Sequence, residues 1–448
     1  MEMLNIRLTE PAKKGCSCDL KAKTETAWKT LLDGAAAGGY GFGWMNLPEQ
    51  DITSLKEMGK KLSTFEYIVL IGIGGSALGT QMLINAFLEP CYPYGEKGKI
   101  PAMFVADNAD ATTNEAIWAQ IDPKTTAVLV VSKSGRTLET LSNFLFFRAK
   151  MYEAIGDAAE AQIFAVTDPD KGFLRNYCNK FNTLSDVIPG NTGGRYSVFT
   201  SCGLVAAIAL GIDADALLAG AGAMKKKLLS GDLTENAASV LAQEIMASEA
   251  VGRKVTVFWS YGDKLKSVSE WFAQLWGESL GKDGKGLTPQ SALGSIDQHS
   301  QLQLYTSGPD DKFFFFLNEK CGEKLKLTVP EGELFDEARY LEGMPQEYVL
   351  ACERRGVAAS LKRRGLPVCE IELDKVDEYC IGGLVMLLET VTALVGFMLE
   401  IDPFDQPGVE EGKNYALALC GNANYAKYLD ILNDIESKAV SKDFSICE

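Results

Sequence analysis

The clearest pattern along the chain is an alternation between short apolar runs and longer segments with helical spacing. Runs of apolar, β-favouring residues occupy positions 67–71, 102–106, 127–131 and 162–166. Helical patterns follow at about 76–88 and 137–155. Because strands that alternate with helices form βαβ units, this order predicts a mostly parallel sheet that is buried on both faces.

A second alternation of the same kind follows a Gly- and Ala-rich helical region at 201–222. Its expected strands lie at 254–259, 313–317 and 368–373, and its expected helices lie at 264–280 and 376–399. The first sixty residues look helical in patches. The two halves share their element order but not their sequence, so we infer no internal repeat.

These patterns predict an α/β protein with two sheet-containing domains and a boundary near residue 235. The expected divisions are a helical N-terminal segment at 1–60, a first domain at 61–235, a second domain at 236–405 and a helical C-terminal segment at 406–448. The longest apolar stretch, 381–399, is interrupted by Glu389, Thr390 and Thr392. A buried helix therefore fits this stretch better than a membrane span.

Composition limits the partners and the location. The chain has 448 residues, 46% hydrophobic and 23% charged, which is ordinary for a globular protein of more than one domain. Its net charge of −16 argues against a nucleic-acid partner, which needs a basic surface. The N-terminus lacks the apolar core of a signal peptide, and the odd count of 11 scattered cysteines favours reduced thiols in the cytoplasm.

Two turns rich in glycine and hydroxyl residues carry the strongest chemical signal. They are GIGGSALG at 72–79, here named the first loop, and SKSGRTLET at 132–140, the second loop. Each follows an expected strand and leads into an expected helix, so backbone N–H groups and the positive end of a helix dipole point at one spot, which favours an anion. The hydroxyl groups that suit a terminal monophosphate are those of Ser76, Ser132, Ser134 and Thr137.

Two other interpretations of the first loop stay open at this point. Its first residues formally match the dinucleotide fingerprint G-x-G-x-x-G/A, with Asp107 where a ribose-binding acid would lie. Against a nicotinamide cofactor, Asp107 follows the turn by about thirty residues instead of roughly twenty, and Ser76 places a hydroxyl where the pyrophosphate approaches closely. Alternatively, the glycines only permit close packing of helix on sheet, although packing alone does not call for the hydroxyls.

Arg195 and the pair Gln274 and Glu278 are further candidates for chemistry. Arg195 follows two glycines and can offer a forked cation to an oxyanion. Gln274 and Glu278 are four residues apart on one face of an expected helix. Glu278 lies near the end of that helix, where the dipole disfavours a carboxylate. In isolation, Arg195 and Glu278 also fit ordinary surface residues.

His299 and Lys413 complete the candidates. His299 is the only histidine, and its unperturbed pKa suits proton transfer near neutrality. No Cys or carboxylate cluster surrounds it in the sequence, so we expect no zinc site. Lys413 follows Pro407, which suits the first turn of a helix. An exposed lysine paired with Glu410 is the strong alternative for Lys413.

Taken together, these segments resemble the glucose-6-phosphate isomerase family in its bacterial-length form. The matching motifs occur in the family's order over roughly 65–415 and are GIGGSALG, SKSGRTLET, GGRYS at 193–197, ESLGK at 278–282, Gln298-His299, and QPGVE at 406–410 with Lys413. Their order makes the match specific. The resemblance implies two sugar-isomerase (SIS) type domains, each a three-layer αβα sandwich around a mostly parallel sheet.

The resemblance also implies a reaction of glycolysis and gluconeogenesis. Glucose 6-phosphate and fructose 6-phosphate interconvert by proton transfer between C2 and C1 through a cis-enediol, without a metal or a cofactor. A small sugar phosphate is then the partner, with no membrane, and the chain is a homodimer with shared active sites. Isomerisation of another hexose 6-phosphate, such as mannose 6-phosphate, and a non-catalytic sugar-phosphate sensor stay open. A sensor would need the phosphate loops but no base.

By resemblance, each candidate residue acquires a role. Glu278 is the base that moves the proton, and Arg195 stands beside the developing enediolate. His299, from the partner subunit, and Lys413 assist ring opening. The residues expected to bind the substrate are Gly75, Ser76, Ser132, Lys133 with the N–H groups around it, Ser134, Thr137, Gln274 and Gln406.

The second loop departs from the family at one position. Bacterial members commonly read SKSGTT, whereas this chain has Arg136 where the first threonine stands. The hydroxyls of Ser132, Ser134 and Thr137 are kept. We hypothesise that Arg136 contacts the phosphate directly or through a water molecule.

Overall fold

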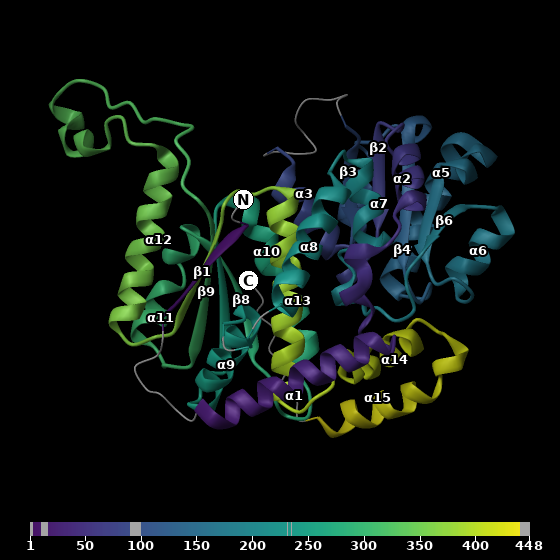
Figure 1. The fold of residues 1–448 in the computed structure, drawn as a ribbon. Helices are drawn as coiled ribbons and strands as arrows, with labels where there is room; N and C mark the ends of the chain where they lie inside the picture. Colours follow the sequence, from purple (N-terminus) through teal and green to yellow (C-terminus); the bar gives the residue numbers. More distant parts are fainter. Residues whose placement is uncertain (1–2, 10–16, 90–99, 231, 234, 440–448) are drawn as a thin grey trace. The chain divides into compact units, whose positions relative to one another are not determined.

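The computed structural model describes residues 3–9, 17–89, 100–230, 232–233 and 235–439. The chain forms two compact units, Met1–Phe404 and Asp405–Glu448. The larger unit contains two five-stranded sheets (Figure 1). The smaller unit carries the helices α14 (Glu410–Leu419) and α15 (Lys427–Lys438).

The first sheet has the strand order β3-β2-β4-β5-β6, and its pairings are parallel. Its strands are β2 (Tyr67–Ile71), β3 (Ala102–Ala106), β4 (Thr126–Ser132), β5 (Ile163–Thr167) and β6 (Leu184–Val187). The helices of this half are α2 (Thr53–Leu62), α3 (Leu78–Phe87), α4 (Ala111–Trp118), α5 (Leu138–Ile155), α6 (Phe173–Phe181) and α7 (Ser201–Ala209). Alternate strand residues face opposite helical layers: Val128 packs in the core with Phe147 of α5, whereas Leu129 packs in the core with Leu83 of α3.

The second sheet has the order β1-β10-β9-β7-β8, with β1 antiparallel to β10 and the other pairings parallel. Its strands are β1 (Leu4–Thr9), β7 (Val255–Tyr261), β8 (Thr288–Gly294), β9 (Lys312–Glu319) and β10 (Val368–Leu373). The helices of this half are α1 (Ser17–Ala36), α8 (Ala214–Leu229), α9 (Ala237–Ala250), α10 (Lys266–Leu280), α11 (Leu302–Ser307), α12 (Gln346–Arg363) and α13 (Glu378–Met398).

Helices cover both faces of the second sheet. Phe314 packs in the core with Leu361 of α12, and its neighbour Phe315 packs in the core with Phe272 of α10. Figure 1 accordingly shows α12 and α13 on opposite sides of this sheet. The core that contains Phe315 also contains Leu70 of β2, so one continuous apolar core joins the two sheets. Within it α3 packs against α10, which brings the first loop and the candidate base toward each other.

Helix α13 corresponds to the apolar stretch at 381–399. Among the described residues it is the helix long and apolar enough to cross a membrane, but 94% of its most apolar window is buried inside the protein. Burial of this kind is usual for a core helix, and α13 packs against α1, α8, α9 and α10. The interpretation of the stretch as a buried helix is confirmed.

The predicted α/β class, with mostly parallel sheets between helices, is confirmed. Three expectations need correction. Residues 4–9, expected in a helical segment, form the strand β1. The helical region at 201–222 is two helices, because the chain turns at Gly211, where φ is +78°. Strands β6 and β8 were not predicted. β8 is an edge strand that contains Pro289 and several polar residues, so it lacks the apolar run that indicates a strand.

Candidate functional site

The first loop runs from the end of β2 to the start of α3 through the turn η2 (Gly74–Ser76). Gly74 has a φ of +59°, a left-handed conformation that favours glycine. Gly75 has no room for a side chain, because a Cβ there would lie 2.1 Å from the carbonyl oxygen of Gly194. The hydroxyl of Ser197 donates to the Gly75 carbonyl at 3.0 Å. The glycines thus bring the first loop against the GGRYS segment.

Asp107, the residue considered for a ribose contact, has a structural partner. Its carboxylate accepts a hydrogen bond of 2.8 Å from the side chain of Gln81 on α3. This bond fixes the end of β3 to the helix that follows the first loop. It favours a role of Asp107 in the fold over a role in binding a dinucleotide.

The second loop gathers three hydroxyl groups at the N-terminus of α5. Thr137 Oγ1 lies 3.3 Å from both Ser132 Oγ and Ser134 Oγ. The N–H of Gly135 donates to Ser132 Oγ at 3.1 Å, and Gly135 adopts a φ of +60°. The N–H of Arg136 donates to Ser134 Oγ at 3.2 Å. Because the positive end of the α5 dipole adds to these donors, the loop offers a suitable environment for an anion.

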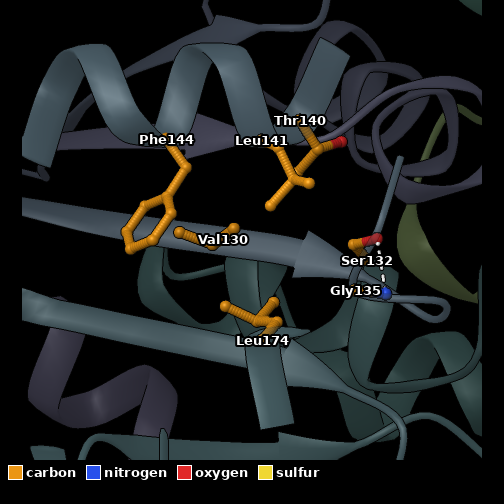
Figure 2. A pocket seen from close by; sticks show the side chains of 7 residues that line it. All are labelled: Val130, Ser132, Gly135, Thr140, Leu141, Phe144 and Leu174. Atoms are coloured by element: carbon orange, nitrogen blue, oxygen red, sulfur yellow. Dashed lines mark hydrogen bonds between the residues drawn. The ribbon is translucent and has the colours of Figure 1, made fainter. Parts of the chain in front are cut away.

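A small space lies behind the second loop, between β4, α5 and α6 (Figure 2). Its apolar lining consists mainly of Val130, Leu141, Phe144 and Leu174. Ser132 stands at its edge, and Figure 2 shows the bond from the Gly135 N–H to Ser132 Oγ. An apolar lining does not suit a phosphate dianion. We therefore expect an anion on the hydroxyl side of the loop and not in this space.

The side chain of Lys133 ties the second loop to the segment that precedes GGRYS. Its Nζ donates to the carbonyl oxygens of Gly190 at 3.0 Å and Thr192 at 2.8 Å. It also lies 5.3 Å from the ring centroid of Tyr40. Burial of the ammonium lowers the pKa of Lys133 from its ordinary value. The Lys133 side chain thus holds the second loop in its conformation, and we expect the backbone N–H of Lys133, not its ammonium group, to face an anion.

Arg195 and Glu278 meet although they come from different halves of the larger unit. Arg195 lies in the turn η5 (Gly194–Tyr196), and its side chain is 2% exposed. Its Nη1 is 3.4 Å from Oε2 of Glu278, whose side chain is 29% exposed near the C-terminal end of α10. The pair therefore joins a buried, oriented cation to a carboxylate that solutes can reach.

Gln274, one helical turn before Glu278, connects the base to the first loop. Its Nε2 donates to Glu278 Oε1 at 2.9 Å. A Cβ at Gly74 would lie 2.9 Å from the same nitrogen, so the loop passes directly over the amide. Gln274 Oε1 is buried and has no hydrogen-bond partner among the described residues. A buried acceptor in this position is available to a hydroxyl group of a ligand.

His299 is separated from Glu278 within the chain. It follows the turn η7 (Ile296–Gln298) after β8, and its side chain is exposed. Gly277, next to Glu278, packs against Pro289 near the start of β8. From there the remainder of β8 spans roughly 17 Å before the turn begins. One chain therefore places His299 and Glu278 at opposite ends of β8.

Gln406 and Lys413 belong to the smaller unit. Gln406 precedes the turn η9 (Pro407–Val409), and Lys413 lies in the first turns of α14. Lys413 Nζ is 3.1 Å from Glu410 Oε1, and both side chains are exposed. This is the ion pair named above as the alternative for Lys413, and an exposed pair contributes little to stability. The roles of Gln406 and Lys413 in the reaction stay predictions.

Two residues that contact Arg195 received no role from the sequence. Ser279 Oγ accepts from Arg195 Nε at 2.7 Å, and the carbonyl oxygen of Pro403 accepts from Nη2 at 2.6 Å. Ser279 is adjacent to Glu278, which is the signal that it lies near the site. Pro403 acts through its backbone, so its residue type carries no signal. Within the described residues no group of three or more His, Cys, Asp or Glu side chains is arranged to hold a metal ion.

Comparison with known proteins identifies relatives of the chain. Residues 45–305 match the family model described as phosphoglucose isomerase. The glucose-6-phosphate isomerase of Rubrobacter xylanophilus is 38% identical over 359 residues, covering 80% of this chain and 83% of the relative. The glucose-6-phosphate isomerase of Carboxydothermus hydrogenoformans is 34% identical, with 90% of each chain covered.

Solved structures agree with this relationship. A structure described as a hypothetical protein from Thermus thermophilus has a TM-score of 0.83 and 31% identity, covering 93% of this chain and 100% of that chain. A glucose-6-phosphate isomerase from Chlamydia trachomatis has a TM-score of 0.76 and 21% identity, covering 96% and 92%; it shows the likeness of fold alone. Since the family model matches more than half of the 448 residues and the relatives match most of the chain, the chain belongs to the phosphoglucose isomerase family.

Proposed function

We propose that the chain catalyses the reversible isomerisation of glucose 6-phosphate to fructose 6-phosphate. The observation that carries the proposal is the meeting of Glu278 with the buried Arg195 at 3.4 Å, beside a loop that passes over Gln274. A carboxylate next to a fixed cation suits proton transfer at a carbon whose conjugate base is an enediolate. Family membership and the activity for which the two relatives are named support the choice of sugar phosphate.

The second loop, with Ser76 of the first loop, would hold the phosphate. The hydroxyls of Ser132 and Ser134 each lie 3.3 Å from that of Thr137 at the start of α5, and backbone N–H groups of the loop lie beside them. The phosphate does not react, so its binding energy can be used to hold the sugar chain in place through both proton transfers.

Glu278 would take the proton from C2 of the sugar and return it to C1. The amide of Gln274 holds one carboxylate oxygen at 2.9 Å, which fixes the direction of the other. Arg195 would stabilise the negative charge that develops on the enediolate oxygen, because its guanidinium is already oriented before the substrate binds. Returning the same proton requires a site shielded from water.

Ring opening would use His299 and Lys413, which are not part of the cluster of Arg195, Gln274 and Glu278. His299 lies at the other end of β8 from Glu278 in its own chain, which supports a homodimer in which each site receives His299 from the second copy. Lys413 and Gln406 of the smaller unit would contact the sugar. We infer a cytoplasmic location, and the described cysteines are free thiols, in keeping with a reducing compartment.

A coupled assay of fructose 6-phosphate turnover, with and without a chelator, tests the proposal. Glu278→Gln is expected to lower kcat by roughly 10²- to 10⁴-fold while binding of the sugar phosphate persists. Glu270→Gln is the matched control, because Glu270 lies on the same helix, is 43% exposed and pairs with Lys266. Near-normal turnover of the Glu278 variant would contradict the assignment of the base.

The same assay separates the alternatives. Higher kcat/KM with mannose 6-phosphate than with glucose 6-phosphate would favour an isomerase of another hexose phosphate. Binding of both sugar phosphates without turnover would favour a sensor.

A further inference from the structure

The guanidinium of Arg195 is fixed by partners away from the reacting atoms. Nε donates to Ser279 Oγ at 2.7 Å, and Nη2 donates to the Pro403 carbonyl at 2.6 Å. Nη1 is the atom 3.4 Å from the Glu278 carboxylate. Since the guanidinium is planar and rigid, bonds at Nε and Nη2 determine where Nη1 lies.

Ser279 is a buried hydroxyl that bonds across elements instead of within its helix. It is 0% exposed. Helical Thr390 and Thr392 donate to backbone carbonyls one turn earlier, at 2.7 Å each, which is the usual arrangement for a buried helical hydroxyl. Ser279 Oγ instead accepts from Arg195 and donates to the hydroxyl of Tyr196 at 3.4 Å.

Tyr196 gives this hydroxyl pair a rigid support. Its ring is 0% exposed, stacks on Trp44 at 5.3 Å and meets Phe404 edge-on at 5.3 Å. Burial of the phenol raises its pKa, so Tyr196 keeps its proton at neutral pH. The chain of contacts therefore runs from packed aromatic rings through Tyr196 and Ser279 to Arg195.

We propose that Ser279 is a positioning residue for the isomerisation: its hydroxyl orients Arg195 toward the enediolate, and its place next to Glu278 in the chain couples that orientation to the base. This inference rests on the proposed function. A buried hydroxyl is costly unless it is hydrogen-bonded, and an alanine would fill this helix position without that cost. The bond to Arg195 is the use that the structure gives it.

Removing the hydroxyl should affect the transition state more than the substrate. Arg195 Nε would lose its acceptor, and because this side chain is only 2% exposed, the guanidinium would turn to find another one. The phosphate-binding hydroxyls lie on other elements and would be unchanged. We therefore expect Ser279→Ala to lower kcat at least roughly tenfold while KM for fructose 6-phosphate stays within about twofold.

Ser269→Ala is the matched control. Ser269 lies on the same helix, is 2% exposed and donates to the Lys266 carbonyl at 2.7 Å, so it tests loss of a buried hydroxyl that does not touch Arg195. Both variants are compared with the parent for thermal unfolding, kcat, KM, inhibition by inorganic phosphate and inhibition by a five-carbon aldonate phosphate, whose carboxylate resembles the enediolate.

The proposal expects the aldonate phosphate to lose affinity for Ser279→Ala by about the same factor as kcat, with inhibition by inorganic phosphate unchanged. It expects Ser269→Ala to match the parent in kcat and in both inhibition constants. A kcat of Ser279→Ala within twofold of the parent, an equal loss in Ser269→Ala, or an equal loss of inorganic phosphate affinity would overturn it.

Ser279→Cys keeps the question decidable if the alanine variant does not fold. A thiol is somewhat larger than the hydroxyl and is a weaker acceptor, but it keeps a polar hydrogen-bonding atom at this position, so an intermediate kcat with unchanged KM is expected. Parental kcat in the cysteine variant would overturn the proposal. A parent chain without turnover contradicts the proposed function itself, and with it this inference, before any variant is compared.

Discussion

At the scale of single residues, the buried carboxyl of Glu389 has a consequence for stability. Glu389 is 0% exposed in α13, and neither of its oxygens has a hydrogen-bond partner among the described residues. Burial raises its pKa well above the ordinary value. The folded chain therefore holds Glu389 protonated, whereas the unfolded chain ionises it above about pH 4.3.

Glu389→Gln should accordingly become more stabilising as the pH rises. A raised folded pKa means that the contribution of Glu389 is fully present below its unfolded pKa and is lost as pH rises toward its folded pKa. Glutamine cannot ionise, so the variant lacks this loss, which amounts to about 1.4 kcal/mol per pH unit within that window. Thermal unfolding measured between pH 5 and pH 8 should show that the melting temperature of the variant rises relative to that of the parent as the pH increases. A difference in melting temperature that does not depend on pH would contradict the protonated state of Glu389. Glu400→Gln, at a side chain 74% exposed, is the control and should show no such trend.

Arg136 offers a second test at this scale. Its side chain is exposed at the N-terminus of α5, beside the hydroxyls of the second loop. An added cation there would attract the phosphate, so Arg136→Thr should raise KM roughly threefold at low ionic strength, and less as salt is added. Lys150→Thr removes one charge farther along α5 and should leave KM unchanged. An unchanged KM for Arg136→Thr would rule out a phosphate contact.

At the scale of elements, the approach of η2 to η5 depends on a glycine. A Cβ at Gly75 would lie 2.1 Å from the Gly194 carbonyl, so Gly75→Ala must move the first loop away from the segment that carries Arg195. We expect a loss of kcat/KM of at least roughly 10²-fold, because small displacements of positioning groups are costly. At Gly190 a Cβ would meet no atom within 4 Å, and Gly190→Ala is the matched control in a steady-state assay. Equal activity of the two variants would contradict the close approach.

Most strands of the two sheets were predictable from the sequence because their signal is local. β2, β3 and β10 occupy the expected positions 67–71, 102–106 and 368–373, where buried apolar residues run together. β1 was missed although its residues 4–9 alternate strictly between apolar and polar, which is the period of a strand. The local pattern could not show its partner, because β10 lies more than 350 residues away.

The site was predictable in part for the same reason. The two loops could be recognised from the spacing of their glycine and hydroxyl residues, and their geometry follows from the order of strand, turn and helix. The contact of Arg195 with Glu278 joins residues from two halves of the chain, and spacing along α10 alone favoured a surface glutamate. The bond from Arg195 to Ser279 depends on side-chain packing across η5 and α10, which no motif encodes.

At the scale of the whole molecule, the position of His299 gives the proposed dimer a decisive test. Glu278 and Arg195 meet within one chain, whereas His299 lies at the other end of β8. If each site takes Glu278 from one copy and His299 from the other, a dimer of one Glu278→Gln chain and one His299→Ala chain contains one intact site and one doubly altered site. Mixing the two inactive variants under conditions that exchange subunits should then restore about a quarter of parental activity, because about half of the dimers are mixed and half of their sites are intact.

The control for this experiment pairs Glu278→Gln with Arg195→Lys. Both altered groups belong to the same site in the same chain, so each site of the mixed dimer lacks one of them and no activity should return. Recovery is measured in the coupled assay after subunit exchange, with size-exclusion chromatography to confirm that dimers form. A Glu278 and His299 mixture that stays as inactive as its components, although mixed dimers are present, would contradict the shared site. Recovery that also appears in the control pair would show that it does not arise from sharing His299 between subunits.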